Sequence, residues 1–144
     1  MAAVSESKQR TEKVILLHGL GRASLSMVYL ANRIQKAGYS AVNLSYPSRK
    51  YPIEKLVTDF IRPQVENEDE SIHFVTHSLG GILVRQLAEM DSRIKIGRVV
   101  MLAPPNKGSE IADAFSNWAC FRALNGPAGE QLGTSTKSLP KSLG

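Results

Sequence analysis

The chain is poor in cysteine, in histidine and in long apolar runs. Its single cysteine among 144 residues, Cys120, excludes an internal disulfide and a cysteine-based metal site. No apolar run approaches the length of about 18 residues that a membrane span needs. The polar residues 1–13 also contain no apolar stretch of the kind found in a secretory signal. We therefore expect a soluble, cytoplasmic protein.

Neither positive nor negative charge is concentrated in any part of the chain. Lys and Arg number 18 and Asp and Glu 13, which gives a formal net charge of +5. The basic residues are scattered, with no run longer than Arg49-Lys50, and aromatic residues make up only 6% of the chain. This distribution lacks the basic patch and recognition motif of nucleic-acid-binding proteins, so we expect no nucleic-acid partner. The apolar content of 42% is instead typical of one soluble domain with a substantial core.

Four short apolar runs alternate with segments in which apolar residues recur at helical spacing. The runs are continuous, as in strands that are buried on both faces. They lie at residues 14–17, 41–44, 72–75 and 99–102. The segments of helical spacing lie at residues 27–37, 52–61, 79–87 and 111–119.

This alternation predicts the α/β fold class. The expected form is a three-layer sandwich, in which a mostly parallel sheet of four strands has helices on both faces. We expect residues 13–125 to form this core, between a flexible tail at 1–12 and a loose tail at 126–144. Pro63 should kink or divide the second helix, because proline cannot donate a backbone hydrogen bond.

Residues 76–81, Thr-His-Ser-Leu-Gly-Gly, stand between the third strand and the helix that follows it. A sharp strand-to-helix turn with a serine at its apex and small residues beside it is a nucleophile elbow, which displays the hydroxyl for attack on an acyl carbon. The helix that begins there directs its free N–H groups toward charge that forms on a substrate. The pattern predicts Ser78 as a catalytic nucleophile, with Gly80 as a supporting residue.

A second unusual segment, His-Gly-Leu-Gly-Arg at residues 18–22, follows the first strand. Ligands of parallel sheets bind beyond the carboxyl ends of the strands, and both segments fall there. Attack of a serine on an ester creates a negatively charged oxygen that needs preorganised donors. We expect the backbone amides of Leu20 and Leu79 to form this oxyanion hole, with His18 and Gly19 supporting the loop.

Simpler interpretations exist for the same residues. Ser78 is also a suitable helix N-cap, and Gly19 and Gly21 suit an ordinary turn. We interpret His18 as an organiser of its loop rather than a proton shuttle. We place His77 in the packing layer, because successive side chains of a strand point to opposite faces.

A dinucleotide-binding fold is a further alternative, since Gly19-x-Gly21-x-x-Ser24 is similar to a broken form of its fingerprint. That fold needs an Asp or Glu near the end of the next strand to hold a ribose, and this chain has Leu44-Ser45-Tyr46 there. We therefore favour the hydrolase interpretation.

Over residues 13–124 the chain resembles the α/β-hydrolase superfamily, specifically its lipase- and esterase-like members with a His-Gly oxyanion loop. The resemblance rests on residues 18–22, 76–81 and 102–109, which fall on matching elements in the family's order. It implies the strand order 2-1-3-4 and hydrolysis of a carboxylic ester or thioester by Ser78, with no metal or cofactor. Thr76 departs from the common pattern, which has glycine at this point of the elbow.

The resemblance does not extend to a complete catalytic triad. The family's acid and histidine follow two further strands that have no counterpart here, and no histidine lies beyond His77. We therefore expect a partial hydrolase domain, truncated at its C-terminus and weak or inactive alone. A non-catalytic binding or assembly module stays open, as does a base from His18, His77 or a partner chain. An incomplete sheet also leaves residues 99–102 as an open apolar edge, which predicts self-association.

Overall fold

A computed structural model describes residues 11–103 of the protein, which form a parallel sheet with its covering helices. The strands are β1 (Lys13–Leu17), β2 (Ser40–Leu44), β3 (Ile72–His77) and β4 (Ile96–Leu102). Their order across the sheet is β2-β1-β3-β4, and every pairing is parallel. The predicted fold class and strand order are confirmed. The helix predicted at 111–119 and the tail predicted at 126–144 lie outside the described residues, as do residues 1–10 of the other tail.

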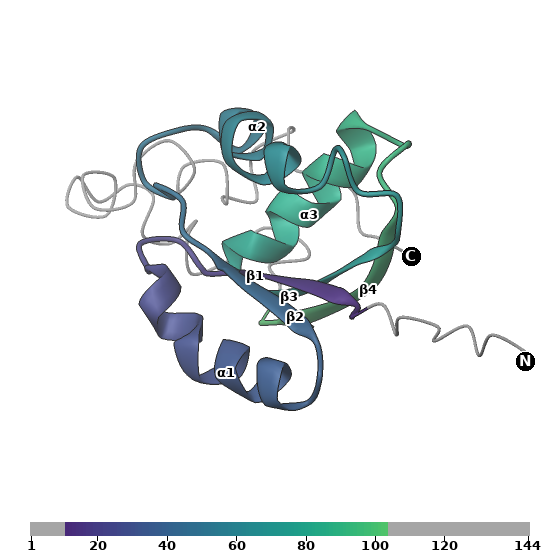
Figure 1. Ribbon diagram of the computed structural model, residues 1–144. Coiled ribbons are helices and arrows are strands. Elements are labelled where there is room, and N and C mark those ends of the chain that lie inside the picture. Colours follow the sequence, from purple (N-terminus) through teal and green to yellow (C-terminus); the bar gives the residue numbers. More distant parts are fainter. Residues whose placement is uncertain (1–10, 104–144) are drawn as a thin grey trace, which may run out of the picture.

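Helices cover both faces of the sheet (Figure 1). α1 (Val28–Lys36), which follows a 3-10 turn at Ser24–Met27, lies on one face. α2 (Ile53–Leu56) and α3 (Leu79–Met90) lie on the other face. Between residues 11 and 103, no helix has the length and apolar character that crossing a lipid bilayer would require.

The core is divided by the alternation of side chains along β1. Ile15 and Leu17 belong to the larger cluster, which lies under α2 and α3. Val14 and Leu16 belong to the smaller cluster, which also contains Met27 and Ala31 from the α1 side. Packing on both faces explains why this strand is a continuous apolar run rather than an alternating one.

The segment that Pro52 opens is helical but irregular. After α2 the backbone widens into a π-helical turn at Val57–Ile61 and then tightens into a 3-10 turn at Arg62–Gln64. Pro63 lies in this last turn, where it cannot donate the bond that a continuing α-helix needs. Proline thus ends the segment rather than kinking a long helix, which refines the prediction.

The first turn of α3 lies directly against the end of β1. A Cβ atom on Gly80 would come within 2.6 Å of the carbonyl oxygen of Leu17 and within 2.8 Å of its Cβ. Non-bonded carbon atoms in close contact lie about 3.5–4.0 Å apart, so only glycine permits this approach. The start of α3 therefore lies beside the loop that leaves β1.

We expect Gly80→Ala to lower the free energy of unfolding by about 1–3 kcal/mol, because the added methyl group must displace backbone atoms. Gly81→Ala is the matched control. Its Cβ would meet only side-chain atoms of Met101 and Thr76, at 3.4 Å, and alanine is the better helix former. The control should be at least as stable as the parent chain. Thermal and urea unfolding of the two variants test this, and equal stabilities would contradict the close approach.

Candidate active site

Ser78 occupies a strained turn between β3 and α3. Its backbone angles are φ 49° and ψ −113°, and it is one of two non-glycine residues between 11 and 103 with positive φ. Such a conformation costs of the order of 1–3 kcal/mol and persists only where neighbouring structure enforces it. Here the Ser78 amide donates to the carbonyl of Leu102 at 3.0 Å, and the Gly81 amide donates to the Ser78 carbonyl at 3.0 Å.

The hydroxyl of Ser78 does not cap the helix that follows it. Ser78 is the N-cap residue of α3, yet its side chain makes no capping hydrogen bond. Within residues 11–103 no other hydrogen bond to its Oγ is formed either, and the residue is partly exposed. The simple N-cap interpretation therefore does not describe Ser78, whose hydroxyl has no hydrogen-bond acceptor among residues 11–103.

The loop after β1 forms a tight turn with two of its amides engaged. The Arg22 amide donates to the Gly19 carbonyl at 3.2 Å, and the Gly21 amide donates to Ser48 Oγ at 3.2 Å. Gly21 has φ 66°, which glycine adopts without strain at this turn position. The Leu20 amide makes no hydrogen bond within the described residues. The same holds for the Leu79 amide, which as the first of α3 has no intrahelical acceptor.

This loop and the serine turn lie side by side. Leu17 at the end of β1 pairs with Thr76 near the end of β3, so the two segments leave the sheet at the same edge. A Cβ on Gly19 would lie 2.8 Å from Nδ1 of His77, the residue before Ser78. Gly19 therefore leaves room for a side chain of the neighbouring segment.

His18 is fully buried and bonded to backbone on both sides of its ring. Nδ1 lies 2.9 Å from the Gly19 carbonyl oxygen, and Nε2 lies 3.5 Å from the Tyr46 amide. A carbonyl accepts and an amide donates, so Nδ1 carries the proton and Nε2 is the acceptor, as in neutral imidazole. Burial lowers the pKa of His18, which agrees with a neutral ring. These contacts are compatible with the predicted role of His18 as a loop organiser, which stays a prediction.

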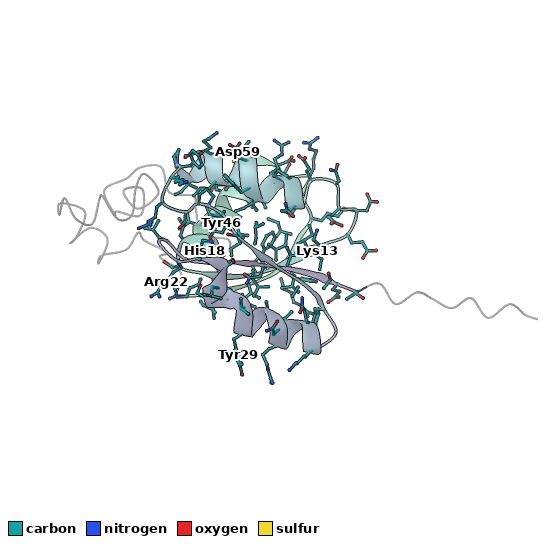
Figure 2. All side chains as sticks on the ribbon, turned by 60° about the vertical axis from the view of Figure 1, so that its left-hand side comes forward. Lys13, His18, Arg22, Tyr29, Tyr46 and Asp59 are labelled. Atoms are coloured by element: carbon teal, nitrogen blue, oxygen red, sulfur yellow. The ribbon has the colours of Figure 1, made fainter. Side chains whose placement is uncertain are left out.

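Tyr46 packs against the ring of His18 and is also hydrogen-bonded to its backbone. Their rings stack with centroids 4.0 Å apart and planes at 11°. The Tyr46 hydroxyl donates to the His18 carbonyl oxygen. Figure 2 shows the two side chains together at one end of the sheet, with Lys13 at the opposite end. The sequence pattern did not single out Tyr46 or Ser48 for this site. Both residues come just after β2, at the carboxyl edge of the sheet, and this position is the signal by which they could have been found from the sequence.

The other two histidines, His73 and His77, both lie on β3. His77 is half-buried and belongs to the face opposite Thr76, as the strand alternation predicted. His73 lies toward the start of β3, where Nδ1 accepts from the Arg98 amide at 2.9 Å and Nε2 lies 3.6 Å from a Glu12 carboxylate oxygen. None of the three rings is hydrogen-bonded to Ser78 in the described part of the chain. Nor do residues 11–103 gather three His, Cys, Asp or Glu side chains that could hold a metal ion.

The fold and this edge define a three-layer α/β protein with a serine displayed at a strand-to-helix turn. Residues 14–142 match the sequence profile described as the alpha/beta hydrolase family, and the chain belongs to that family. No curated protein sequence gives a significant match.

Solved structures share the fold. The mature lipase BlEst2 of Bacillus licheniformis is 24% identical with a TM-score of 0.68, over 92% of this chain and 59% of that one. Phospholipase PlaB of Legionella pneumophila is 18% identical with a TM-score of 0.65, over 88% and 34%. A monoacylglycerol lipase of Paleococcus ferrophilus is 24% identical with a TM-score of 0.59, over 76% and 49%. The chain thus spans 59% or less of each of these proteins.

We expect the stability of the protein to fall as the pH drops below about 6.5, the ordinary pKa of histidine. The pKa of His18 is lowered in the folded state, so the unfolded chain binds the proton more readily. The stabilisation is complete above that pH and is lost as the pH falls toward the lowered value, with a slope of at most about 1.4 kcal/mol per pH unit. His18→Gln should flatten the slope, since His73 and His77 remain in both chains. Urea unfolding between pH 7.5 and 5 measures it, and parallel profiles would contradict a buried neutral ring.

Proposed function

We propose that this chain is a carboxylic-ester hydrolase in which Ser78 is the nucleophile. Membership of the alpha/beta hydrolase family supports a hydrolase. The observation that carries the choice of residue is the backbone of Ser78, with φ 49° and no capping bond from its hydroxyl. Strain at a residue whose side chain is left uncommitted is typical of a functional position.

The reaction follows from the groups at this edge. Ser78 Oγ forms a bond to the acyl carbon and loses its proton to a base, while the carbonyl π electrons move onto oxygen. In this proposal the Leu20 and Leu79 amides receive that oxyanion, which is supported by neither amide being hydrogen-bonded within the described residues. The alkoxide or thiolate then leaves with a proton, and water hydrolyses the acyl-serine to the acid. Lipases and a phospholipase among the structural neighbours favour acyl esters of lipid type as substrates.

The base is the part of the site that residues 11–103 do not supply. In a serine protease, loss of the histidine costs about a million-fold in kcat, which corresponds to about 8 kcal/mol of barrier. His18 and His73 are hydrogen-bonded to other groups, and within residues 11–103 the His77 ring makes no hydrogen bond to Ser78. We therefore propose that the base comes from another chain or from outside the described residues. The printed chain alone should turn over esters weakly.

A binding or assembly module is the second candidate, and the same observation favours it. A sheet edge with a displayed hydroxyl and two amides that are unbonded within residues 11–103, but without a base at Ser78, is able to hold an acyl group or carboxylate without cleaving it. The reactivity of Ser78 separates the two functions.

Incubation with a fluorophosphonate probe should label Ser78, slowly but selectively, as located by peptide mass spectrometry. Ser78→Ala should abolish labelling and reduce p-nitrophenyl acetate turnover to the buffer rate, because the attacking oxygen is removed. Ser26→Ala is the matched control, since its hydroxyl bonds to Ala23 in an exposed turn. No labelling, with turnover equal in parent and Ser78→Ala, would favour the binding module. Labelling that persists in Ser78→Ala would contradict the assignment of the nucleophile.

We also propose that the chain self-associates through β4. This strand stands last in the order of the described sheet. Val100 and Leu102 on it are 53% and 41% exposed. Beside β4, on the α1 face, lies an apolar groove of about 380 Å³ lined in part by Ile34, Val75 and Val100. Exposed apolar strands at a sheet edge pair readily with other chains. This groove is at the far end of the sheet from Ser78, near Glu12 and His73, so it is not the acyl site.

Light scattering coupled to size-exclusion chromatography should show oligomers that grow with protein concentration. Val100→Lys should shift the population toward monomer, because a charged side chain at a strand edge opposes pairing. Tyr29→Lys makes a similar change on the exposed face of α1, where Tyr29 is 78% exposed and points away from the sheet (Figure 2). It should leave the distribution unchanged. A clean monomer at high concentration for the parent chain would refute the proposal.

A further inference from the structure

The loop between β2 and α2 buries polar side chains that are hydrogen-bonded to the loop after β1. Tyr46 is 5% exposed and Ser48 3% exposed, and His18 beside them is fully buried. Polar groups in such positions are costly unless each has a partner. Their partners lie across the two loops, about 28 residues apart in sequence.

Three contacts join the two loops. The Tyr46 hydroxyl donates to the His18 carbonyl, and the Tyr46 amide lies 3.5 Å from Nε2 of the same residue. Ser48 Oγ accepts from the Gly21 amide at 3.2 Å. These contacts hold the loop after β1 at His18, which precedes Leu20, and at Gly21, which follows it.

The β2–α2 loop is itself held rigidly. The Ser48 amide donates to the Tyr46 carbonyl at 2.9 Å, and the Lys50 amide donates to the Pro47 carbonyl at 3.0 Å. Proline also fixes its own backbone angle. The loop therefore presents the phenol of Tyr46 and the hydroxyl of Ser48 as two fixed points.

We propose that Tyr46 and Ser48 are positioning residues that fix the turn after β1 and thereby orient the Leu20 amide. Ser48 binds the Gly21 amide, so the peptide that follows Leu20 is held in one orientation. Tyr46 binds the carbonyl of His18, so the chain is held before Leu20 as well. The Gly21 and Arg22 amides are engaged, whereas the Leu20 amide makes no hydrogen bond within residues 11–103, so Leu20 carries an amide that is available for an oxyanion. The inference rests on the proposed function, because it gives this amide its role.

Two measurements on the full chain test this inference. Amide hydrogen exchange by NMR should show the Gly21 amide protected in the parent, and exchanging at least about tenfold faster in Ser48→Ala. Fluorophosphonate labelling of Ser78, taken to saturating probe, should fall by about tenfold or more in maximal rate for Ser48→Ala and for Tyr46→Phe. The half-saturating probe concentration should change by less than about twofold, since a positioning residue acts on the reacting geometry and not on probe binding.

Matched controls are Ser26→Ala and Tyr29→Phe, which remove the same atoms from exposed positions and should leave both readouts at parent values. Unchanged exchange at Gly21 in Ser48→Ala would overturn the inference. So would maximal labelling at the parent rate in both Ser48→Ala and Tyr46→Phe. Absence of labelling in the parent chain refutes the nucleophile instead. In that case exchange at Gly21 alone decides whether Ser48 fixes the turn, faster exchange in Ser48→Ala supporting it and unchanged exchange overturning it.

Discussion

The site depends on the contact between Gly80 and the carbonyl of Leu17. A hypothetical Cβ on Gly80 would lie 2.6 Å from that oxygen, so no larger residue fits where the first turn of α3 approaches β1. Because β1 and β3 are neighbouring parallel strands, the two loops that leave them already share one edge. The glycine contact then sets the distance between them. The same packing of α3 maintains the strained backbone of Ser78, because Leu79 and Leu83 of this helix are fully buried.

A second constraint comes from buried polar groups. His18, Tyr46 and Ser48 are nearly inaccessible to water, and each satisfies a group on the neighbouring loop. A protonated His18 would present an N–H to the Tyr46 amide, where an acceptor is required, so the network favours the neutral ring. This explains why a histidine next to a candidate oxyanion loop serves structure rather than proton transfer. Its two nitrogens have no capacity left for a substrate or for Ser78.

The sequence predicts most of the sheet and the position of Ser78, because those signals are local. The continuous apolar run of residues 14–17 requires packing on both faces, and a serine followed by two glycines between a strand and a helix specifies a turn. The strand order came instead from family resemblance, since no local pattern states which strands are neighbours. For the same reason the contacts of Tyr46 and Ser48 with residues 18–21 were not foreseen, because they exist only once β2 lies beside β1. The π-helical turn at Val57–Ile61 has no signature in the apolar spacing.

Display of the Ser78 hydroxyl and supply of a base to it are physically separable in this protein. The strands β1 and β3 with helix α3 determine where Ser78 and the amides of Leu20 and Leu79 lie. An oxyanion donor is worth about 3–4 kcal/mol of barrier, whereas a missing histidine costs about 8 kcal/mol. That cost is measured with the oxyanion donors in place, so two donors leave only a residual rate of about a thousand-fold over water. A hydrolase that receives its base from elsewhere and a binding module that never receives one need the same geometry at this edge. The two differ only in whether a proton acceptor reaches Ser78 Oγ. The reactivity of that oxygen therefore distinguishes the hydrolase from the binding module.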